Sequence, residues 1–252
     1  MKPTRRKGLL AATLSCLLLL VCSIIGNATN TTYPEFNEEE IRQRVLNLQS
    51  TVVKPRYTSV VKSYLRTYTV HNREKSEKIL GKSILYFDLF EQKLRQFGLP
   101  EDLKYLSVVE SALNPKAVSS AGAVGLWQFM PATGKEYGLN INYSVDDRCD
   151  PEKSTEAAVQ YLLKAYNRFG DWALALAAYN SGSGRVSRAI KRARTKDFWS
   201  IQKYLPKETR NYVPAFIAAT YLMHHYDKHD LYPRYPHLDM QITEAVMVYG
   251  GM

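Results

Sequence analysis

VVESALNPKAVSSAGAVGLWQFMP, residues 108–131, is the stretch that decides the fold. In it an apolar run ends at a carboxylate, Glu110, and a turn, a loop of small residues and a Trp–Gln pair follow. Upstream, Pro100 and the two acidic residues after it are typical of a helix start, which predicts a helix over residues 101–110. Leu103, Leu106 and Glu110 then share one face at helical spacing, so we expect this carboxylate to be buried.

Burial of Glu110 would change its acidity. Loss of water disfavours the charged form of a carboxyl group and raises its pKa. A carboxyl group that keeps its proton near neutral pH is suited to general acid catalysis. The alternative, from spacing alone, is a glutamate at a helix end that faces solvent or caps a neighbour.

Several motifs support the first interpretation. Glu110-Ser111, the string SSAGAVGLWQFMP at 119–131 and Ala178-Tyr179-Asn180 resemble the motifs of the soluble lytic transglycosylase domain. That family has the goose-type lysozyme fold and cleaves bacterial peptidoglycan. The strings DDRCDPEKSTEAAVQYL, GDWALALAAYNSGSGRV and LPKETRNYVPAF resemble the membrane-bound lytic murein transglycosylase D subgroup in particular. The resemblance covers about residues 80–220.

The N-terminal segment has the pattern of an export signal. Residues 2–7 carry four basic and no acidic side chains, residues 8–26 form an apolar run, and Gly26-Asn27-Ala28 is a small-x-small cleavage pattern. We therefore expect residues 1–28 to be a signal peptide and the protein to reach the periplasm or cell envelope. The alternative is an uncleaved membrane anchor, because the run nearly reaches the ~20 residues that span a bilayer.

The rest of the chain is predicted to be helical. Apolar residues recur at helical spacing, while caps, Gly and Pro separate the segments and no alternating strand pattern occurs. The expected fold class is all-α, and the resemblance makes it lysozyme-like: a catalytic domain over residues 80–225, after a linker and helical arm over 29–79 and before a tail over 226–252. The arm is expected to pack on the catalytic domain, the alternative being a docking or dimer surface. The predicted helices are 38–48, 56–69, 72–97, 101–110, 131–137, 151–169, 172–180 and 206–225, with a flexible loop at 181–184.

One carboxylate stands out for catalysis. Ordinary glycosidases place two carboxyl groups beside the bond, but the central stretch offers only Glu110. We expect Asp146, Asp147 and Asp150 to cap the next helix and to pair with Arg148. The resemblance implies a reaction that needs one acid. Glu110 would protonate the glycosidic oxygen between N-acetylmuramic acid and N-acetylglucosamine, then deprotonate the muramyl C6 hydroxyl that attacks C1, leaving a 1,6-anhydromuramyl end.

Six polar residues are candidate substrate-binding groups. The amide of Gln128 can donate and accept, which suits a sugar hydroxyl or N-acetyl group, and Tyr212 matches a late tyrosine of the family that faces the acid. The alternative for the serines is loop capping, and Trp127 and Phe129 are either a floor for sugars or part of the core. The six candidates are Ser111, Ser119, Gln128, Tyr179, Asn180 and Tyr212.

Charge is consistent with an anionic polymer as partner. The net charge is +10, and +6 without residues 1–28. The basic run 185–196 is either a solvated helix face or a surface that attracts acidic stem peptides or other wall anions. The expected partners are peptidoglycan glycan strands; nucleic acid is not expected for an exported protein, and membrane association would come only from an uncleaved N-terminal segment.

Other function classes find less support. The five histidines form no metal-binding pattern with Glu110, so we expect no metal and no cofactor. Cys149 is the only cysteine after residue 28, so an intramolecular disulfide is not possible in the cleaved chain, and no histidine lies near it in sequence, which favours a buried packing role over a reactive nucleophile. We expect a monomer. Two alternatives stay open: a lysozyme-like hydrolase on the same fold, and a non-catalytic protein that binds the cell wall.

Overall fold

The computed structural model describes residues 34–50 and 52–236. Within these ranges every regular element is a helix, and only three isolated bridges pair extended residues, which confirms the all-α prediction. The predicted signal peptide and tail residues 237–252 lie outside the described ranges. The elements are α2 (Glu38–Leu46), α3 (Ser59–Arg66), a π-helix η1 (Thr67–His71), α4 (Arg73–Gln96), η2 (Glu101–Tyr105), α5 (Leu106–Ser111), α6 (Pro131–Glu136), η3 (Asp147–Cys149), α7 (Pro151–Phe169), α8 (Trp172–Ser181), α9 (Ser183–Ala193), α10 (Phe198–Ile201), η4 (Gln202–Tyr204), α11 (Lys207–His225) and η5 (Tyr226–His229).

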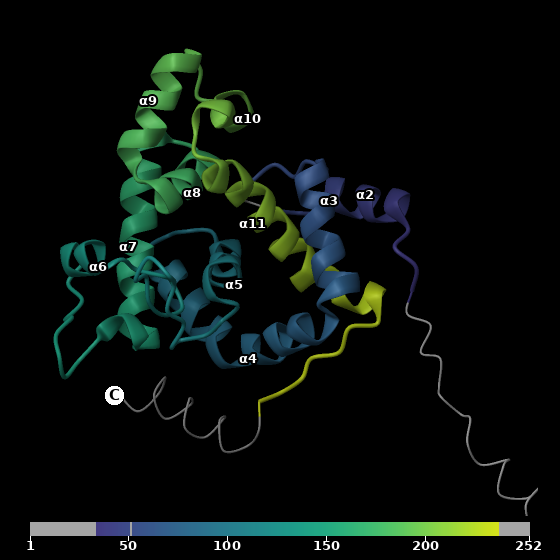
Figure 1. The fold of residues 1–252 in the computed structure, drawn as a ribbon, viewed down its shortest axis with the longest axis horizontal. Coiled ribbons are helices and arrows are strands. Elements are labelled where there is room, and N and C mark those ends of the chain that lie inside the picture. Colours follow the sequence, from purple (N-terminus) through teal and green to yellow (C-terminus); the bar gives the residue numbers. More distant parts are fainter. Residues whose placement is uncertain (1–33, 51, 237–252) are drawn as a thin grey trace, which may run out of the picture. The chain divides into compact units, whose positions relative to one another are not determined.

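Helix α11 joins helices from three parts of the chain (Figure 1). It packs against α3 from the predicted arm, against α8, and against α5. Every residue from 212 to 222 is buried, as expected for a helix that has no polar face over this length. The arm and the helix that carries Glu110 therefore rest on the same central helix.

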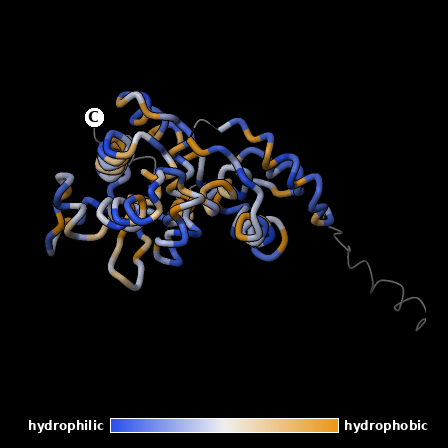
Figure 2. Tube along the Cα trace, turned by 90° about the horizontal axis from the view of Figure 1, so that it is seen from above, coloured by the Kyte–Doolittle hydropathy of each residue, from blue (hydrophilic) through white to orange (hydrophobic). Residues whose placement is uncertain are grey.

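Helices α3, α7 and α9 are amphipathic, whereas residues 173–178 of α8 are all buried; hydrophilic and hydrophobic positions along the chain are coloured in Figure 2. In α4 the buried side chains of Tyr86 and Phe90 stack at 6.0 Å, and Phe90 lies 4.9 Å from the ring of Trp127. Trp127 is fully buried and its indole N–H donates to the Thr155 hydroxyl at 2.9 Å. The structure thus places Trp127 in the core rather than on the floor of a sugar site.

Two predicted segments differ from the structure. The flexible loop predicted at 181–184 is wrong, because α8 runs to Ser181 and α9 begins at Ser183. Gly182 alone separates them, with a φ of 83° that a side chain would disfavour. The helix predicted over 101–110 is divided: residues 101–105 form a 3-10 turn, and α5 continues from Leu106 to Ser111.

The described part of the predicted tail runs along α4. The backbone N–H of Arg234 donates to the carbonyl of Glu77 at 2.9 Å, and its guanidinium pairs with the Glu77 carboxylate at 2.8 Å. Gly81 allows this approach, since a Cβ there would lie 1.8 Å from the carbonyl oxygen of Arg234. In the described residues no helix is both long and apolar enough to cross a bilayer.

Candidate active site

Glu110 lies in the last turn of α5, directly before a sharp change of direction. Ala112 and Leu113 both have left-handed backbone conformations, with φ of 53° and 57°, which end the helix. Such a conformation is strained for residues with a side chain and is found most often at functional sites. The hydroxyls of Ser107 and Ser111 each donate to the carbonyl of Leu126 at 3.0 Å, so the loop is tied to the helix beside Glu110.

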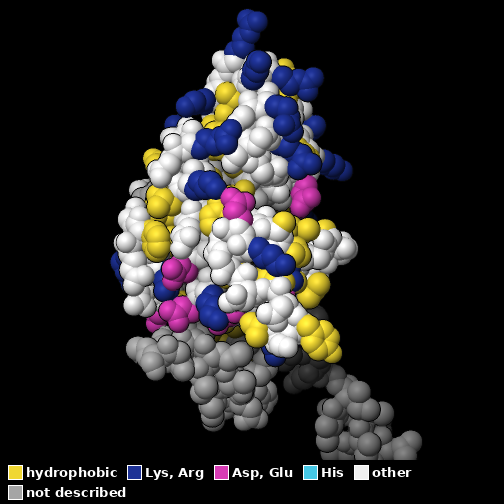
Figure 3. Space-filling view, turned by 90° about the vertical axis from the view of Figure 1, so that its left-hand side faces the viewer, with side chains coloured by type: hydrophobic (Ala, Val, Ile, Leu, Met, Phe, Trp, Pro, Cys, Tyr) yellow, Lys and Arg dark blue, Asp and Glu magenta, His cyan; other side chains and the backbone are white. Residues whose placement is uncertain are grey.

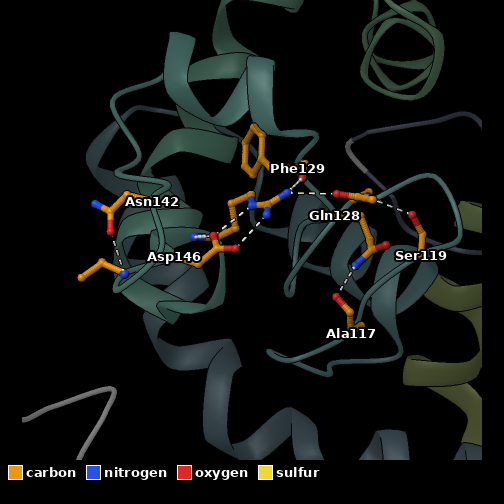
Figure 4. Close-up of polar contacts among 10 residues, drawn as sticks. Ala117, Ser119, Gln128, Phe129, Asn142 and Asp146 are labelled. Atoms are coloured by element: carbon orange, nitrogen blue, oxygen red, sulfur yellow. Dashed lines mark hydrogen bonds and ion pairs between the residues drawn. The ribbon is translucent and has the colours of Figure 1, made fainter.

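A buried arginine holds the loop that faces Glu110 (Figure 4). The guanidinium of Arg148 donates to the carbonyls of Gly122 and Phe129 at 3.0 and 3.1 Å, and it pairs with Asp146 at 2.7 Å. Gly125 lies against the same segment, because a Cβ there would sit 1.8 Å from the carbonyl oxygen of Arg148. These contacts hold the backbone of the 119–129 loop in place.

Asp146 and Asp150 have the structural roles predicted for them, whereas Asp147 pairs with a lysine of α7 instead of capping that helix or pairing with Arg148. Asp146 pairs with Arg148, Asp147 pairs with Lys153 at 2.9 Å, and Asp150 accepts from two backbone N–H groups at the start of α7. The pKa values of Asp146 and Asp147 are held below the ordinary range by hydrogen bonds from these partners. All three carboxylates are thus engaged away from Glu110.

The acidity of Glu110 is strongly shifted. Burial among protein atoms raises its pKa to about 7, the carboxylate of Glu208 adds a smaller rise, and a hydrogen bond from Tyr212 opposes both. The Tyr212 hydroxyl donates to Glu110 Oε1. Burial and the neighbouring charge raise the pKa of Tyr212 well above its usual value, so this tyrosine remains a donor. Glu110 therefore exchanges its proton near neutral pH, as the sequence predicted.

Glu110 stands where two cavities meet. The larger, of about 790 Å³, extends toward α6, α8 and the start of α11; the smaller, of about 450 Å³, extends toward α3, η1 and α4. A ligand that fills both passes the carboxyl group of Glu110. The residues that line both cavities are Tyr64, Val109, Glu110, Ser119 and Gln128.

The structure brings the predicted site residues together. Ser119, Gln128, Tyr179, Asn180 and Tyr212 line the larger cavity with Glu110, while Ser111 lines the smaller one. They come from α5, the loop, α8 and α11, so the chain from residue 110 to residue 212 converges on one place.

Three of the predicted residues also form hydrogen bonds to the backbone of the loop: Ser111, Ser119 and Gln128. The Ser111 hydroxyl accepts from the backbone of Asn114 at 3.1 Å, and the Ser119 hydroxyl accepts from the backbone of Ala123 at 2.9 Å. Gln128 has a φ of 49° and donates its amide N–H groups to the carbonyl of Ala117 at 3.2 Å (Figure 4) and to that of Gly125 at 2.9 Å. No described residue donates to its side-chain oxygen, which leaves that acceptor for a ligand.

Tyr179 and Asn180 lie in the last turn of α8, where they line the cavity and connect α8 to the 119–129 loop and to α11. The Tyr179 hydroxyl donates to the carbonyl of Trp127 at 2.8 Å. Asn180 accepts from the hydroxyl of Thr209 at 2.7 Å and donates to the carboxylate of Glu208 at 3.3 Å. The amide of Asn180 therefore orients a second carboxylate on the cavity wall.

Sequence reasoning missed several residues that line the larger cavity, among them Tyr64, Tyr161 and Glu208. Tyr64 and Tyr161 belong to amphipathic helices, where helical spacing does not distinguish a cavity wall from a core position. Glu208 is two residues after Pro206, where acidic residues commonly stabilise the first turn of a helix. In the part of the chain that the structure describes, no cluster of three or more His, Cys, Asp or Glu residues could hold a metal ion.

Comparison with known proteins agrees with this geometry. Residues 88–202 match the family model of the transglycosylase SLT domain. The chain is 44% identical over 133 residues to membrane-bound lytic murein transglycosylase D of Escherichia coli strain K12, covering 51% of this chain and 29% of that protein. It is 32% identical over 143 residues to the soluble lytic murein transglycosylase of the same strain, covering 54% of this chain and 22% of that protein. The chain thus spans less than a third of the length of these relatives.

A solved structure shows the same fold. The 70 kDa soluble lytic transglycosylase from Escherichia coli superposes with a TM-score of 0.51 and 27% identity, over 68% of this chain and 31% of that one. The region that contains Glu110 is therefore similar to lytic transglycosylases both in sequence and in fold. Residues 88–202 are therefore similar to the transglycosylase SLT domain family, and the described helices have the lysozyme-like all-α fold of the lytic transglycosylases.

Proposed function

We propose that this protein is a lytic murein transglycosylase of the bacterial cell envelope. It cleaves the β-1,4 bond between N-acetylmuramic acid and N-acetylglucosamine and leaves a 1,6-anhydromuramyl end. The observation that carries the proposal is Glu110, a carboxyl group with a pKa of about 7 at the junction of two cavities. A glycan that occupies both cavities presents one of its bonds to this group.

Glu110 acts first as an acid. Near pH 7 about half of the molecules carry the proton, which is the balance a group needs when it both gives and takes one. The proton passes to the glycosidic oxygen, the bond from that oxygen to muramyl C1 breaks, and positive charge develops at C1. The carboxylate that remains accepts the hydrogen bond of Tyr212, which stabilises it between the two proton transfers.

Glu110 then acts as a base. It takes the proton of the muramyl C6 hydroxyl, whose oxygen attacks C1 and closes the anhydro bridge. The carboxyl group is thereby protonated again, and no water is consumed. A single acid–base residue is sufficient because the substrate supplies its own nucleophile.

One observation favours a second candidate function. Glu208 lines the larger cavity, so a carboxylate is present that could activate water in a lysozyme-like hydrolase. Glu208 is exposed and is held by Asn180. We assign it a supporting role, since it raises the pKa of Glu110.

Digestion of purified peptidoglycan in ¹⁸O-labelled water separates the two functions. We expect fragments lighter by one water than lysozyme products, with no label at the muramyl end. Glu110→Gln should lower the rate by about 10²–10⁴-fold, whereas Glu208→Gln should keep most of the activity and move the alkaline limb of the pH–rate profile to lower pH. Labelled reducing ends, together with equal losses in both variants, would support the hydrolase.

The cellular location is part of the same proposal. The pattern of residues 1–28 supports export to the periplasm. We expect the mature chain to begin near Thr29, and the mass of protein recovered from the envelope tests this. A mass that includes residues 1–28 would replace cleavage with the anchor model.

A further inference from the structure

A groove with a strongly basic lining lies beside the site, between α9 and the segment that joins η4 to α11. Its volume is about 870 Å³. Side chains of lysine and arginine gather on the face of the molecule where α9 lies (Figure 3). An apolar floor separates the cations, since Ala189, Leu205 and Pro206 also line the groove. The basic residues that line it are Arg185, Arg188, Lys191, Arg192, Lys203 and Arg210.

These cations are not neutralised within the protein. All six are exposed, and no carboxylate in the described ranges forms an ion pair with any of them. The sequence has no acidic residue between Asp171 and Asp197. Arg188 and Arg192 stand four residues apart on α9, a like-charge spacing that destabilises a helix.

The contacts that the groove cations do make are to neutral groups. Arg192 and Lys203 lie 5.6 and 5.2 Å from the centre of the Tyr204 ring. Arg185 donates to the carbonyl of Ser181 at 3.0 Å and Arg210 to that of Leu205 at 2.8 Å. These contacts hold the side chains in place and leave their charge for an anionic ligand.

The groove and the catalytic cavity are neighbours that share one lining residue. Arg185 lines both, and Ser181 and Gly182, just before it, line the catalytic cavity. The groove therefore adjoins the proposed glycan site at Arg185. A substituent that branches from a sugar in the cavity can enter the groove, whereas a separate ligand would have to share this opening with the glycan.

We propose that this groove binds the acidic peptide stem of the peptidoglycan strand whose glycan occupies the catalytic cavity. The proposal rests on the proposed function, and it adds that the enzyme prefers strands that carry stems. The charges of the peptide and the groove are complementary, because the carboxylates along the peptide can pair with the unneutralised cations of the groove.

The match is also one of length. Helix α9 has 11 residues and so is about 16 Å long, and an extended peptide of four or five residues spans about 13–18 Å. Short apolar side chains of such a peptide have Ala189 and Leu205 to pack on.

A triple variant tests the proposal. Arg188→Gln, Lys191→Gln and Arg192→Gln together remove three groove cations and keep good helix-forming residues. The matched control is Lys135→Gln, Arg194→Gln and Lys207→Gln, which removes three exposed cations that line neither the groove nor the cavities. Both variants lower the net charge equally, so a general attraction to an anionic wall affects them alike.

Each protein is assayed on two substrates: uncross-linked glycan strands with stems, and the same strands after an amidase has removed the stems. We expect wild type and control to have a kcat/KM about tenfold higher on the strands with stems, since an exposed ion pair contributes about a factor of two and three are involved. The groove variant should lose this preference and cleave stripped strands like wild type. The preference of wild type should also fall with added salt.

Three results would overturn the inference: an unchanged preference in the groove variant, an equal loss in the control, or an equal loss on stripped strands. A groove variant that binds stems normally but loses binding to phosphatidylglycerol vesicles would assign the groove to a membrane surface instead.

Binding of stem-bearing and stripped fragments is measured in the Glu110→Gln background as well. This readout needs no turnover, so it still tests the groove if wild type releases no anhydromuramyl product and the proposed function fails.

Discussion

Replacing Glu110 with Gln should stabilise the protein in a way that depends on pH. The pKa of Glu110 is about 7 in the folded protein and 4.5 for an unperturbed glutamate. Each factor of ten between the two ionisation constants corresponds to about 1.4 kcal/mol, so the ionised carboxylate costs the folded state about 3 kcal/mol. Gln has a similar shape and no charge to desolvate.

The two pKa values determine how the stability difference between Glu110→Gln and wild type changes with pH. Below about pH 4.5 the carboxyl group is protonated in both the folded and the unfolded chain, and the wild type carries no penalty. Stability is lost as the pH rises from 4.5 through 7, and the loss is constant above that range. The free energy of unfolding of Glu110→Gln should therefore exceed that of wild type by little at pH 4 and by about 3 kcal/mol at pH 8.

Urea unfolding followed by tryptophan fluorescence at pH 4, 6 and 8 measures this difference. Asp88→Asn is the control, because Asp88 is an exposed carboxylate and the substitution should change stability by less than about 0.5 kcal/mol at every pH. If the difference between Glu110→Gln and wild type were the same at pH 4 and pH 8, the carboxylate would not be desolvated. The assignment of its raised pKa to burial would then fail.

Three further substitutions test the surroundings of the site. Tyr212→Phe removes the hydrogen bond that lowers the pKa of Glu110, so the alkaline limb of the pH–rate profile should move to higher pH, and a shift to lower pH would contradict the geometry. Gly125→Ala places a Cβ against the carbonyl of Arg148 at a φ of 88°, and a thermal melt should show a decrease of at least about 5 °C, equivalent to about 2 kcal/mol. Cys149→Ala should retain wild-type activity against peptidoglycan, because burial raises the pKa of this thiol and it lines neither cavity; loss of activity in the folded variant would make it a site residue.

The all-α fold and the place of Glu110 could be predicted because each depends on local patterns. Helical spacing indicated that Leu103 and Leu106 are buried and that Glu110 is shielded from solvent; both leucines are buried and Glu110 is half-buried, although residues 101–105 form a 3-10 turn outside α5. Burial raises the pKa of Glu110 to about 7. Capping signals located the aspartates, since Asp150 accepts from the backbone at the start of α7 as predicted. These features involve residues that are close in sequence, so helical spacing and capping preferences are sufficient to predict them.

What could not be predicted depends on contacts between distant segments. Tyr64 reaches the site only because α3 packs on α11, and no local pattern specifies that packing. The loop expected at 181–184 was wrong because SGSG is a flexible composition in isolation, whereas in the fold α8 is buried up to Ser181 and α9 packs on it, so that Gly182 alone interrupts the helices. The burial of Trp127 likewise depends on Phe90 and Thr155, which lie far from it in the chain.

The hydrogen bond between Tyr212 and Glu110 joins residues that are 102 positions apart. During synthesis, Glu110 leaves the ribosome long before α11 does, and until then α3, α5 and α8 lack the helix on which they pack. A nascent chain, or a fragment that ends before α11, has no assembled pocket for a glycan. The site around Glu110 is therefore complete only after α11 has joined the fold, and a proteolytic cut that detaches α11 would remove Tyr212 and Glu208 from it.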